Sequence, residues 1–265
     1  MPLPLTHPIA SPKTVLVFGG TTEGKQVAAA LGGTGYSFWY STKNQVEISL
    51  PANGRYRWGA FTVAALVEFC QQQRVGCLVH ASHPFAEQLH ATVAAASEQL
   101  GVPVLRLERA YPERLAHPLV HYLADYEEVA AHLLAAGYAP VLALSGVQTL
   151  ARLRAYWQQR PMFCRVLPRA ASVALARQAG FPEANLLAAW PGAALADEVQ
   201  LIRQIGARAV VTKESGESGF LSVKVAAALQ AGVPIFIVQR PDLPAAFHCL
   251  TSPAELLARL PSYLL

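Results

Sequence analysis

The chain has 265 residues, of which 53% are hydrophobic and 14% are charged, and its formal net charge is +4. This composition is typical of a globular protein with one large core or two smaller ones. The positive excess is small and no basic run is interleaved with aromatic residues, so the sequence argues against nucleic acid as a partner and fits a small anionic ligand.

The N-terminal segment and the cysteines bear on the compartment. No apolar run reaches the roughly 18 residues that a membrane span needs. The first 14 residues, MPLPLTHPIASPKT, lack the charged and then apolar regions of a signal peptide, and their prolines predict a loose arm. The cysteines form no CxxC pair and no zinc spacing, which predicts buried free thiols at Cys70, Cys77, Cys164 and Cys249. We therefore expect a cytoplasmic protein with no membrane partner.

Short β-rich runs alternate along the chain with longer segments rich in alanine and leucine. The predicted strands are 14–19, 36–41, 76–81, 103–108, 118–123, 140–145, 162–168, 185–190, 208–213 and 234–239. Three of the predicted helices end in glycine, which is favoured just past a helix C-terminus: 85–101, 194–206 and 220–232. This alternation predicts an α/β protein with parallel sheets.

Two stretches interrupt the alternation. PANGRYRW (51–58) predicts a turn-rich loop, and ERAYPERLAHP (108–118) contains two prolines and little periodicity. The second stretch is the better domain boundary, because it separates two parts that each have the size of an α/β domain. We therefore expect domains at 1–115 and 116–265.

The first predicted strand runs directly into a glycine-rich turn, VLVFGGTTEG (15–24). Gly19 and Gly20 would let the backbone approach a ligand, and the N–H groups of the helix that follows attract phosphate. Thr21 and Thr22 could donate hydroxyls or cap that helix, and Glu23 suits its positive end but would have to point away from a phosphate. A plain strand-to-helix turn is the alternative.

The end of the next strand indicates which cofactor this turn would hold. An acidic residue about 20 positions after the glycines binds the ribose of NAD. Here that region carries Ser41, Thr42 and Lys43 and no carboxylate, which favours the 2′-phosphate of NADP(H). A polar turn without a ligand remains the alternative. The chain has no GxxxxGK[ST] phosphate loop, which disfavours ATP or GTP hydrolysis.

HASHPFAEQLH (80–90) brings His80, His83, Glu87 and His90 close together in the sequence. A helix that starts at Pro84 would place Glu87 and His90 on one face, but this spacing is common by chance, and we expect no metal site. His80 and His83 are better placed in a loop after a strand, where α/β proteins bind ligands. For His90 we favour a structural role.

The stretch VVTKESGESG (210–219) repeats the pattern of strand, glycine turn and helix. Lys213, Ser215 and Gly216 would hold a carboxylate or a phosphate. Arg165 lies inside a predicted strand, where a charge needs a partner or a ligand, and Arg240 ends the last predicted strand. Two anion-binding turns, one in each expected domain, predict a ligand cleft between the domains.

Taken together, these motifs resemble the precorrin-6A reductase family of cobalamin biosynthesis, including its cobalt-precorrin members. The resemblance covers most of the chain, and its order and spacing fit in GGTTEG (19–24), HPFA (83–86), VPVLRLER (102–109), SGVQ (145–148), RVLP (165–168), VTKESGESG (211–219) and VQRP (238–241). It implies two Rossmann-like domains and reduction of a ring C=C of an anionic tetrapyrrole by hydride transfer from NADPH. Other enzymes of the same pathway are the further partners that it suggests.

The resemblance also implies roles for individual residues. The cofactor-binding residues would be Gly19, Gly20, Thr21, Thr22, Glu23, Ser41, Thr42 and Lys43. The substrate-binding residues would be His83, Lys213, Ser215, Gly216 and Arg240. Lys213 or His83 could serve as the catalytic proton donor, and the choice between them stays open.

The chain departs from the family at Trp190, Pro191 and Gly192, where many members have Gly-Pro-Phe. This difference leaves open a reductase of another macrocycle. A tetrapyrrole- or nucleotide-binding protein that has lost hydride transfer is a further alternative.

Overall fold

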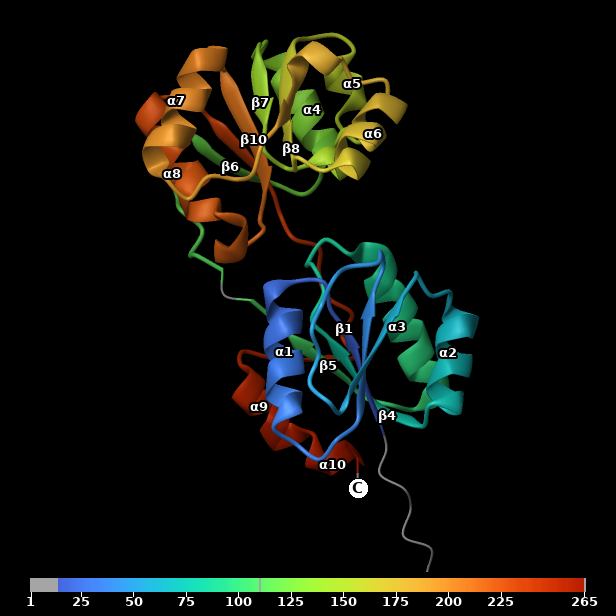
Figure 1. Ribbon diagram of the computed structural model, residues 1–265. Helices are drawn as coiled ribbons and strands as arrows, with labels where there is room; N and C mark the ends of the chain where they lie inside the picture. The colour runs from blue at the N-terminus through green and yellow to red at the C-terminus, as the bar shows by residue number, and fades with distance from the viewer. Residues whose placement is uncertain (1–13, 110, 265) are drawn as a thin grey trace, which may run out of the picture. The chain divides into compact units, whose positions relative to one another are not determined.

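The computed structural model describes residues 14–109 and 111–264, so the predicted N-terminal arm lies outside the described residues. The chain forms two compact units. Unit 1 comprises Met1–Arg109 and Pro241–Leu265, and unit 2 comprises Ala110–Arg240. Unit 2 is therefore inserted into unit 1 (Figure 1).

Unit 1 is built on a parallel sheet, here called sheet A, with the strand order β12-β5-β4-β1-β2-β3. Its strands are β1 (Thr14–Phe18), β2 (Phe38–Thr42), β3 (Gly54–Trp58), β4 (Val75–His80), β5 (Val104–Leu107) and β12 (Phe247–Leu250). Its helices are α1 (Thr22–Gly32), α2 (Val63–Gln72), α3 (Glu87–Leu100), α9 (Pro253–Arg259) and α10 (Pro261–Leu264). Read from β3, this is the Rossmann order 3-2-1-4-5-6, with β12 as the sixth strand.

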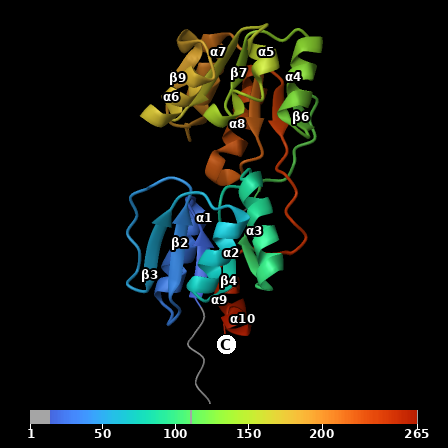
Figure 2. The same ribbon diagram turned by 90° about the vertical axis from the view of Figure 1, so that its right-hand side faces the viewer.

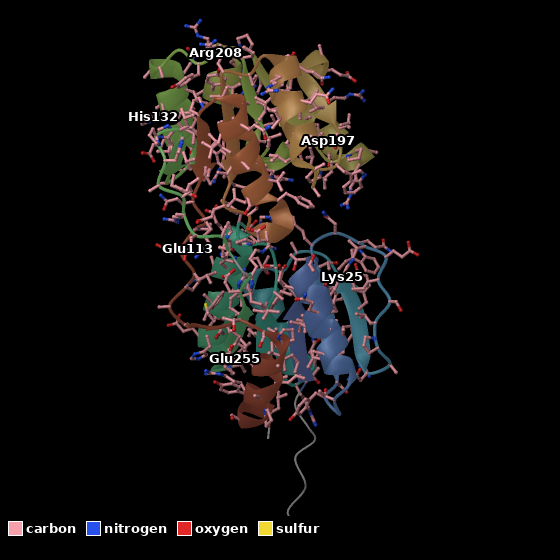
Figure 3. All side chains as sticks on the ribbon, turned by 90° about the vertical axis from the view of Figure 1, so that its left-hand side faces the viewer. Lys25, Glu113, His132, Asp197, Arg208 and Glu255 are labelled. Carbon is pink, nitrogen blue, oxygen red and sulfur yellow. The ribbon has the colours of Figure 1, made fainter. Side chains whose placement is uncertain are left out.

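Helices cover both faces of sheet A because its central strands are apolar on both faces. Val15 and Val17 of β1 pack toward α1, α9 and α10, whereas Leu16 and Phe18 pack toward α2 and α3. Helices α1 and α9 lie side by side on the same face (Figure 1). In Figure 3 they carry the labelled residues Lys25 and Glu255, respectively. The C-terminal edge of the sheet is left for loops.

Unit 2 is built on a second parallel sheet, sheet B, with the order β6-β11-β10-β7-β8-β9. Its strands are β6 (Val120–Leu123), β7 (Val141–Ala143), β8 (Met162–Val166), β9 (Leu186–Ala188), β10 (Ala209–Lys213) and β11 (Ile235–Val238). Its α-helices are α4 (Tyr126–Ala135), α5 (Arg154–Trp157), α6 (Ala170–Gln178), α7 (Leu195–Ile205) and α8 (Leu221–Ala231), and its short 3₁₀ helices are η1 (Val147–Thr149), η2 (Glu183–Asn185) and η3 (Glu217–Gly219). Helices α7 and α8 cover one face, and α4 lies on the other (Figures 1 and 2).

The two sheets share one strand order. In sheet B, β7, β8, β9, β10 and β11 take the places of β1 to β5 in sheet A. The sixth place is filled by β12, from the end of the chain, in sheet A and by β6, from the start of the unit, in sheet B. The predicted α/β class with two Rossmann-like sheets is thus confirmed.

The expected domain limits need a correction. The change of unit lies at Arg109–Ala110, and residues 241–265 belong to unit 1 rather than to the second domain. The physical reason is β12, which pairs in parallel with β5, so that Phe247 lies opposite Val104 and Leu250 opposite Leu107. Helices α9 and α10 follow β12 and complete the core of unit 1.

All ten predicted strands are present, but two observed strands were not predicted. The loop expected at 51–58 contains β3, which pairs with β2 along its whole length. The three predicted helix ends at glycine are confirmed. Helices α3, α7 and α8 are followed directly by Gly101, Gly206 and Gly232, with φ of 64°, 64° and 70°.

Cys70, Cys77 and Cys164 are buried and free, whereas Cys249 is exposed, contrary to expectation. Within the described residues, no helix is both long and apolar enough to cross a membrane.

Candidate functional site

The centre of sheet A has the geometry of a nucleotide-binding edge. After β1 the chain crosses to β2, and after β4 it crosses to β5 on the other side. Ligands of open α/β sheets bind at such a topological switch point, outside the carboxyl ends of the two strands. The loops that meet here are 19–21 and 81–83, and the Thr21 hydroxyl joins them by donating to the Ala81 carbonyl at 2.6 Å.

The turn after β1 needs its glycines for close packing. A Cβ atom on Gly19 would lie 2.1 Å from Cζ of Tyr40, and one on Gly24 would lie 2.7 Å from Cα of Gly19. Gly20 has a φ of 92°, a conformation that residues with a side chain rarely adopt. Its N–H donates to the Tyr40 hydroxyl at 2.9 Å. Tyr40 thus fixes the shape of the turn, and the Gly20 N–H is used in a hydrogen bond within unit 1.

Helix α1 begins at this turn with its N-terminus toward the edge. Thr21 caps it by accepting from the Gly24 N–H at 3.1 Å, and Thr22, the first helical residue, is exposed. The Glu23 carboxylate pairs with the Arg109 guanidinium at 3.0 Å. Glu23 therefore binds a cation of unit 1 from within the first turn, where its charge also suits the helix dipole.

The end of β2 lies against the turn. The Gly19 N–H donates to the Ser41 carbonyl at 3.0 Å, and a Cβ on Gly20 would lie 3.8 Å from the Thr42 methyl carbon. Lys43 follows on an exposed bend. The structure thus brings the predicted cofactor-binding residues together at one edge of unit 1.

The histidines differ from expectation. His80 is the last residue of β4, not a loop residue, and its side chain is fully buried, with Nδ1 at 2.7 Å from Arg106 Nη1. Arg106 is itself 1% exposed and also donates to the Ser82 carbonyl at 2.9 Å. His83 is half-buried in the loop and accepts from the Phe85 N–H at Nδ1. Helix α3 starts at Glu87 rather than Pro84, and among residues 14–109 and 111–264 there is no group of three potential metal ligands.

His90 is buried, as its predicted structural role requires, and its ring lies 4.9 Å from that of His80. Burial lowers the pKa of His90 to about 4, and the positive Arg106 adds to the effect. Burial also holds the pKa of His80 well below 6.5, again with Arg106 contributing. Both imidazoles are therefore neutral in the folded protein at neutral pH.

We expect the protein to lose stability as the pH falls below about 6.5, the ordinary histidine pKa. There the unfolded chain binds protons at His80 and His90 that the folded chain does not, so the free energy of unfolding falls by up to about 1.4 kcal/mol per pH unit for each. Urea unfolding between pH 7.5 and 4.5 measures this slope. His90→Gln should reduce this slope by the contribution of one histidine. The control His248→Gln, at an exposed position on β12, should leave the slope unchanged. An unchanged slope in His90→Gln would contradict the argument.

Unit 2 has a switch point of its own between β7 and β10. Each strand is followed by a Ser-Gly pair and a 3₁₀ turn, and Gly146 and Gly216 share a conformation, with φ of 89° and 74°. Lys213 is the last residue of β10, and Ser215 and Gly216 follow it. The predicted substrate-binding residues of unit 2 therefore lie at one edge of sheet B, whereas His83 belongs to unit 1.

Glu214, which the sequence interpretation did not assign to the site, organises this edge. It is 2% exposed and accepts two hydrogen bonds from Arg114, at 2.9 and 3.0 Å. It also accepts from the Arg240 N–H at 3.1 Å. Burial alone would raise the pKa of the Glu214 carboxyl, but these bonds outweigh burial and lower it. Arg240 stacks over the Tyr111 ring, 3.7 Å from its centroid.

Two further buried charges lie behind the edge. Lys224 on α8 donates to the Gly219 carbonyl at 2.8 Å and to the Leu144 carbonyl at 3.5 Å, which links the two switch-point loops. Burial lowers its pKa to about 8. Arg165, for which the sequence predicted a partner or a ligand, pairs with Glu198 of α7 at 2.6 Å.

A cavity of about 490 Å³ lies beside this ion pair. It is lined by Arg165, Leu186, Leu187, Ala188, Ala189, Trp190, Gly192, Asp197, Glu198 and Leu201. Trp190, where the chain departs from the family pattern, is 59% exposed at this cavity, and Arg169 lies 5.4 Å from its ring centroid. Gly192 donates its N–H to Glu198 at 3.0 Å.

Sequence reasoning missed several residues at these two sheet edges. They come from a strand that was not predicted or from the segment that connects the units, so their distance along the sequence does not indicate that they lie at a site. Arg57 of β3 donates to the Ser41 hydroxyl at 2.7 Å. The Tyr56 hydroxyl lies 2.8 Å from the Thr42 hydroxyl. Arg109 and Arg114 reach Glu23 and Glu214 from the segment between the units. The alternation of β3 was the available signal for Arg57.

Comparisons with known proteins agree with this geometry. A family model described as Precorrin-6x reductase CbiJ/CobK matches residues 14–260. A precorrin-6A reductase of Rhodococcus erythropolis is 32% identical over 250 residues, which cover 92% of this chain and 96% of that protein. A cobalt-precorrin-6A reductase of Methanothermobacter thermautotrophicus is 29% identical over 236 residues, covering 87% of this chain and 77% of that protein. A solved structure, CobK precorrin-6A reductase, matches with a TM-score of 0.76 and 27% identity over 95% of this chain and 97% of that one.

Proposed function

The chain belongs to the precorrin-6x reductase CbiJ/CobK family, and from this premise we propose that it reduces a ring C=C of precorrin-6A, or of its cobalt form, with NADPH. The observation that carries the proposal is the edge of sheet A: a Rossmann strand order with a glycine turn and a capped helix at its switch point. Such an enzyme would work in the cytoplasm, beside the other enzymes of cobalamin biosynthesis.

The residues at the edge of unit 1 fit a dinucleotide. The first N–H groups of α1 have no partner within the helix and would bind the pyrophosphate. Gly24 lets α1 pack closely on Gly19, the role of the last glycine in dinucleotide-binding turns. Thr22 is exposed and could add a hydroxyl, while Ser41 and Thr42 would face the adenosine ribose. Lys43 would add a positive charge near the 2′-phosphate.

The chemistry divides between cofactor and protein. Bound NADPH supplies the hydride for one ring carbon, and a proton adds to the neighbouring carbon. The protein would orient the macrocycle and hold its carboxylates, for which we propose Lys213, Ser215, Gly216 and Arg240. His83 accepts a hydrogen bond at Nδ1, so the proton that it could donate would be on Nε2. We propose His83 or Lys213 as the proton donor.

Turnover tests the proposal. We expect oxidation of NADPH when the purified protein receives precorrin-6A or cobalt-precorrin-6A, with one equivalent consumed per ring reduced. The rate with each substrate decides whether cobalt is required. Binding of the tetrapyrrole without oxidation of NADPH would favour a non-catalytic binding protein instead.

A variant in unit 2 separates the two binding events. We expect Lys213→Met to raise the KM for the tetrapyrrole by about tenfold, the loss of one charge-assisted contact, and to leave the Kd of NADPH unchanged. Lys25→Met, at an exposed position of α1, is the matched control and should change neither value. Equal KM values for the two variants would remove Lys213 from the substrate site.

A further inference from the structure

Strand β3 adds a charged residue to the nucleotide-binding edge of unit 1. It lies beside β2 and pairs with it in parallel (Figure 2). In the register, Arg57 lies directly opposite Ser41. Parallel pairing brings the carboxyl ends of both strands to the same edge of the sheet. The side chains of Arg57 and Ser41 therefore share one face at the place where a ribose 2′-substituent would lie.

Arg57 is held in a defined position. Its Nη1 donates to the Ser41 hydroxyl at 2.7 Å, and its Nη2 donates to the Trp58 carbonyl at 3.0 Å. The guanidinium stacks over the Phe61 ring, 3.7 Å from the centroid. Such contacts fix the planar fork before any ligand arrives, so little side-chain entropy remains to be lost on binding.

The charge of Arg57 lacks an anion within the described residues. The side chain is half-buried, and no carboxylate of residues 14–109 or 111–264 lies within ion-pair distance of it. Burial lowers the pKa of the Arg57 guanidinium, which nevertheless stays protonated at neutral pH. A partly desolvated cation beside the Ser41 hydroxyl is well matched to a phosphate monoester.

Lys43 is placed differently. It lies on an exposed bend after β2, and its side chain has no hydrogen bond or ion pair among the described residues. The bend itself is shaped by β3, because the Tyr56 hydroxyl accepts from the Val46 N–H and the Gly59 N–H donates to the Thr42 and Lys43 carbonyls. A mobile, hydrated ammonium contributes less to selectivity than a positioned guanidinium.

We propose that Arg57, rather than Lys43, is the residue that makes the site select NADPH over NADH, by binding the 2′-phosphate together with the Ser41 hydroxyl. The inference rests on the proposed function, because it requires that the edge of unit 1 binds a nicotinamide dinucleotide. It names the residue that sets the cofactor preference of that site.

The test compares four proteins by calorimetric titration with NADPH and NADH: the wild type, Arg57→Gln, Lys43→Gln and Arg55→Gln. Arg55 is the matched control because it lies on the same strand and face, one pleat farther from the edge, with its guanidinium over Trp39. We expect Arg57→Gln to raise the Kd of NADPH by about tenfold to a hundredfold, the loss of a charge-assisted contact, with the Kd of NADH unchanged. Lys43→Gln should raise the Kd of NADPH by less than about threefold, and Arg55→Gln should not change it.

Each other outcome overturns a defined part of the proposal. If Arg57→Gln weakens NADPH and NADH equally, Arg57 supports the fold of the edge and does not select the cofactor. If Lys43→Gln has the larger effect, the selecting residue is Lys43. Arg57→Lys keeps the charge and should recover only part of the affinity, and full recovery would contradict the role of the planar fork. Failure of the wild type to bind either dinucleotide would overturn the proposed function as well.

Discussion

Gly19→Ala is expected to destabilise unit 1 by about 3 kcal/mol and to abolish NADPH binding. A methyl group at this position would lie 2.1 Å from Cζ and 2.2 Å from the hydroxyl oxygen of Tyr40. Tyr40 cannot yield easily, because it is 1% exposed and its hydroxyl accepts from the Gly20 N–H. The clash therefore displaces either the turn or strand β2, and both shape the proposed cofactor site.

Urea unfolding and NADPH titration measure the two effects. Gly35→Ala is the control, since a methyl group there would meet nothing within 4 Å. Adding Tyr40→Ala to Gly19→Ala removes the ring that clashes, so the two substitutions should be strongly non-additive in a double-mutant cycle. Wild-type stability and affinity in Gly19→Ala would show that the turn is looser than its packing indicates.

Glu198→Ala is expected to destabilise unit 2 by about 3–5 kcal/mol, the range for removing one partner of a buried ion pair. Glu198 is 1% exposed, and besides Arg165 it accepts from the Gly192 N–H. Its removal would leave the guanidinium of Arg165, 8% exposed, without its anion and close to the buried Lys224. The pKa of Lys224 should then fall below its present value of about 8, since the Glu198 charge now supports it.

The combination Arg165→Met with Glu198→Leu tests whether the loss comes from the unpaired charge. Apolar residues of similar volume should restore most of the stability, because they remove the desolvated charges together. Urea unfolding of the three variants, with exchange of backbone amides in β8 as a local probe, gives the comparison. A double variant as unstable as Glu198→Ala would mean that the packing around Gly192, and not the charge, matters most.

The sequence predicts the local parts of this fold well and its distant pairings poorly. The β1 turn was predicted because an apolar strand, two glycines and a helix cap are adjacent in the chain. Strand β12 was missed because it is four residues long and joins β5, a strand more than a hundred residues earlier. Nothing in FHCL itself indicates that pairing.

The same contrast applies to the site. Ser41, Thr42 and Lys43 could be proposed from their distance to the glycines alone. Arg57 was not proposed, because GRYRW follows Pro51-Ala52-Asn53, begins with a glycine and carries two arginines, which resembles an exposed loop. The structure shows that these arginines lie over aromatic rings, Arg55 over Trp39 and Arg57 over Phe61, so that charged residues occupy a strand.

The insertion of unit 2 into unit 1 has a consequence for biosynthesis on the ribosome. Sheet B is complete once residue 240 has emerged, whereas sheet A must wait for β12 and the helices that follow it. The N-terminal strands are thus made first and their unit is finished last, with an unpaired β5 edge in the meantime. Glu214 binds both Arg114 and Arg240 and so holds the two ends of the inserted segment together. The segment from Pro241 onward therefore starts from a defined position when it completes unit 1.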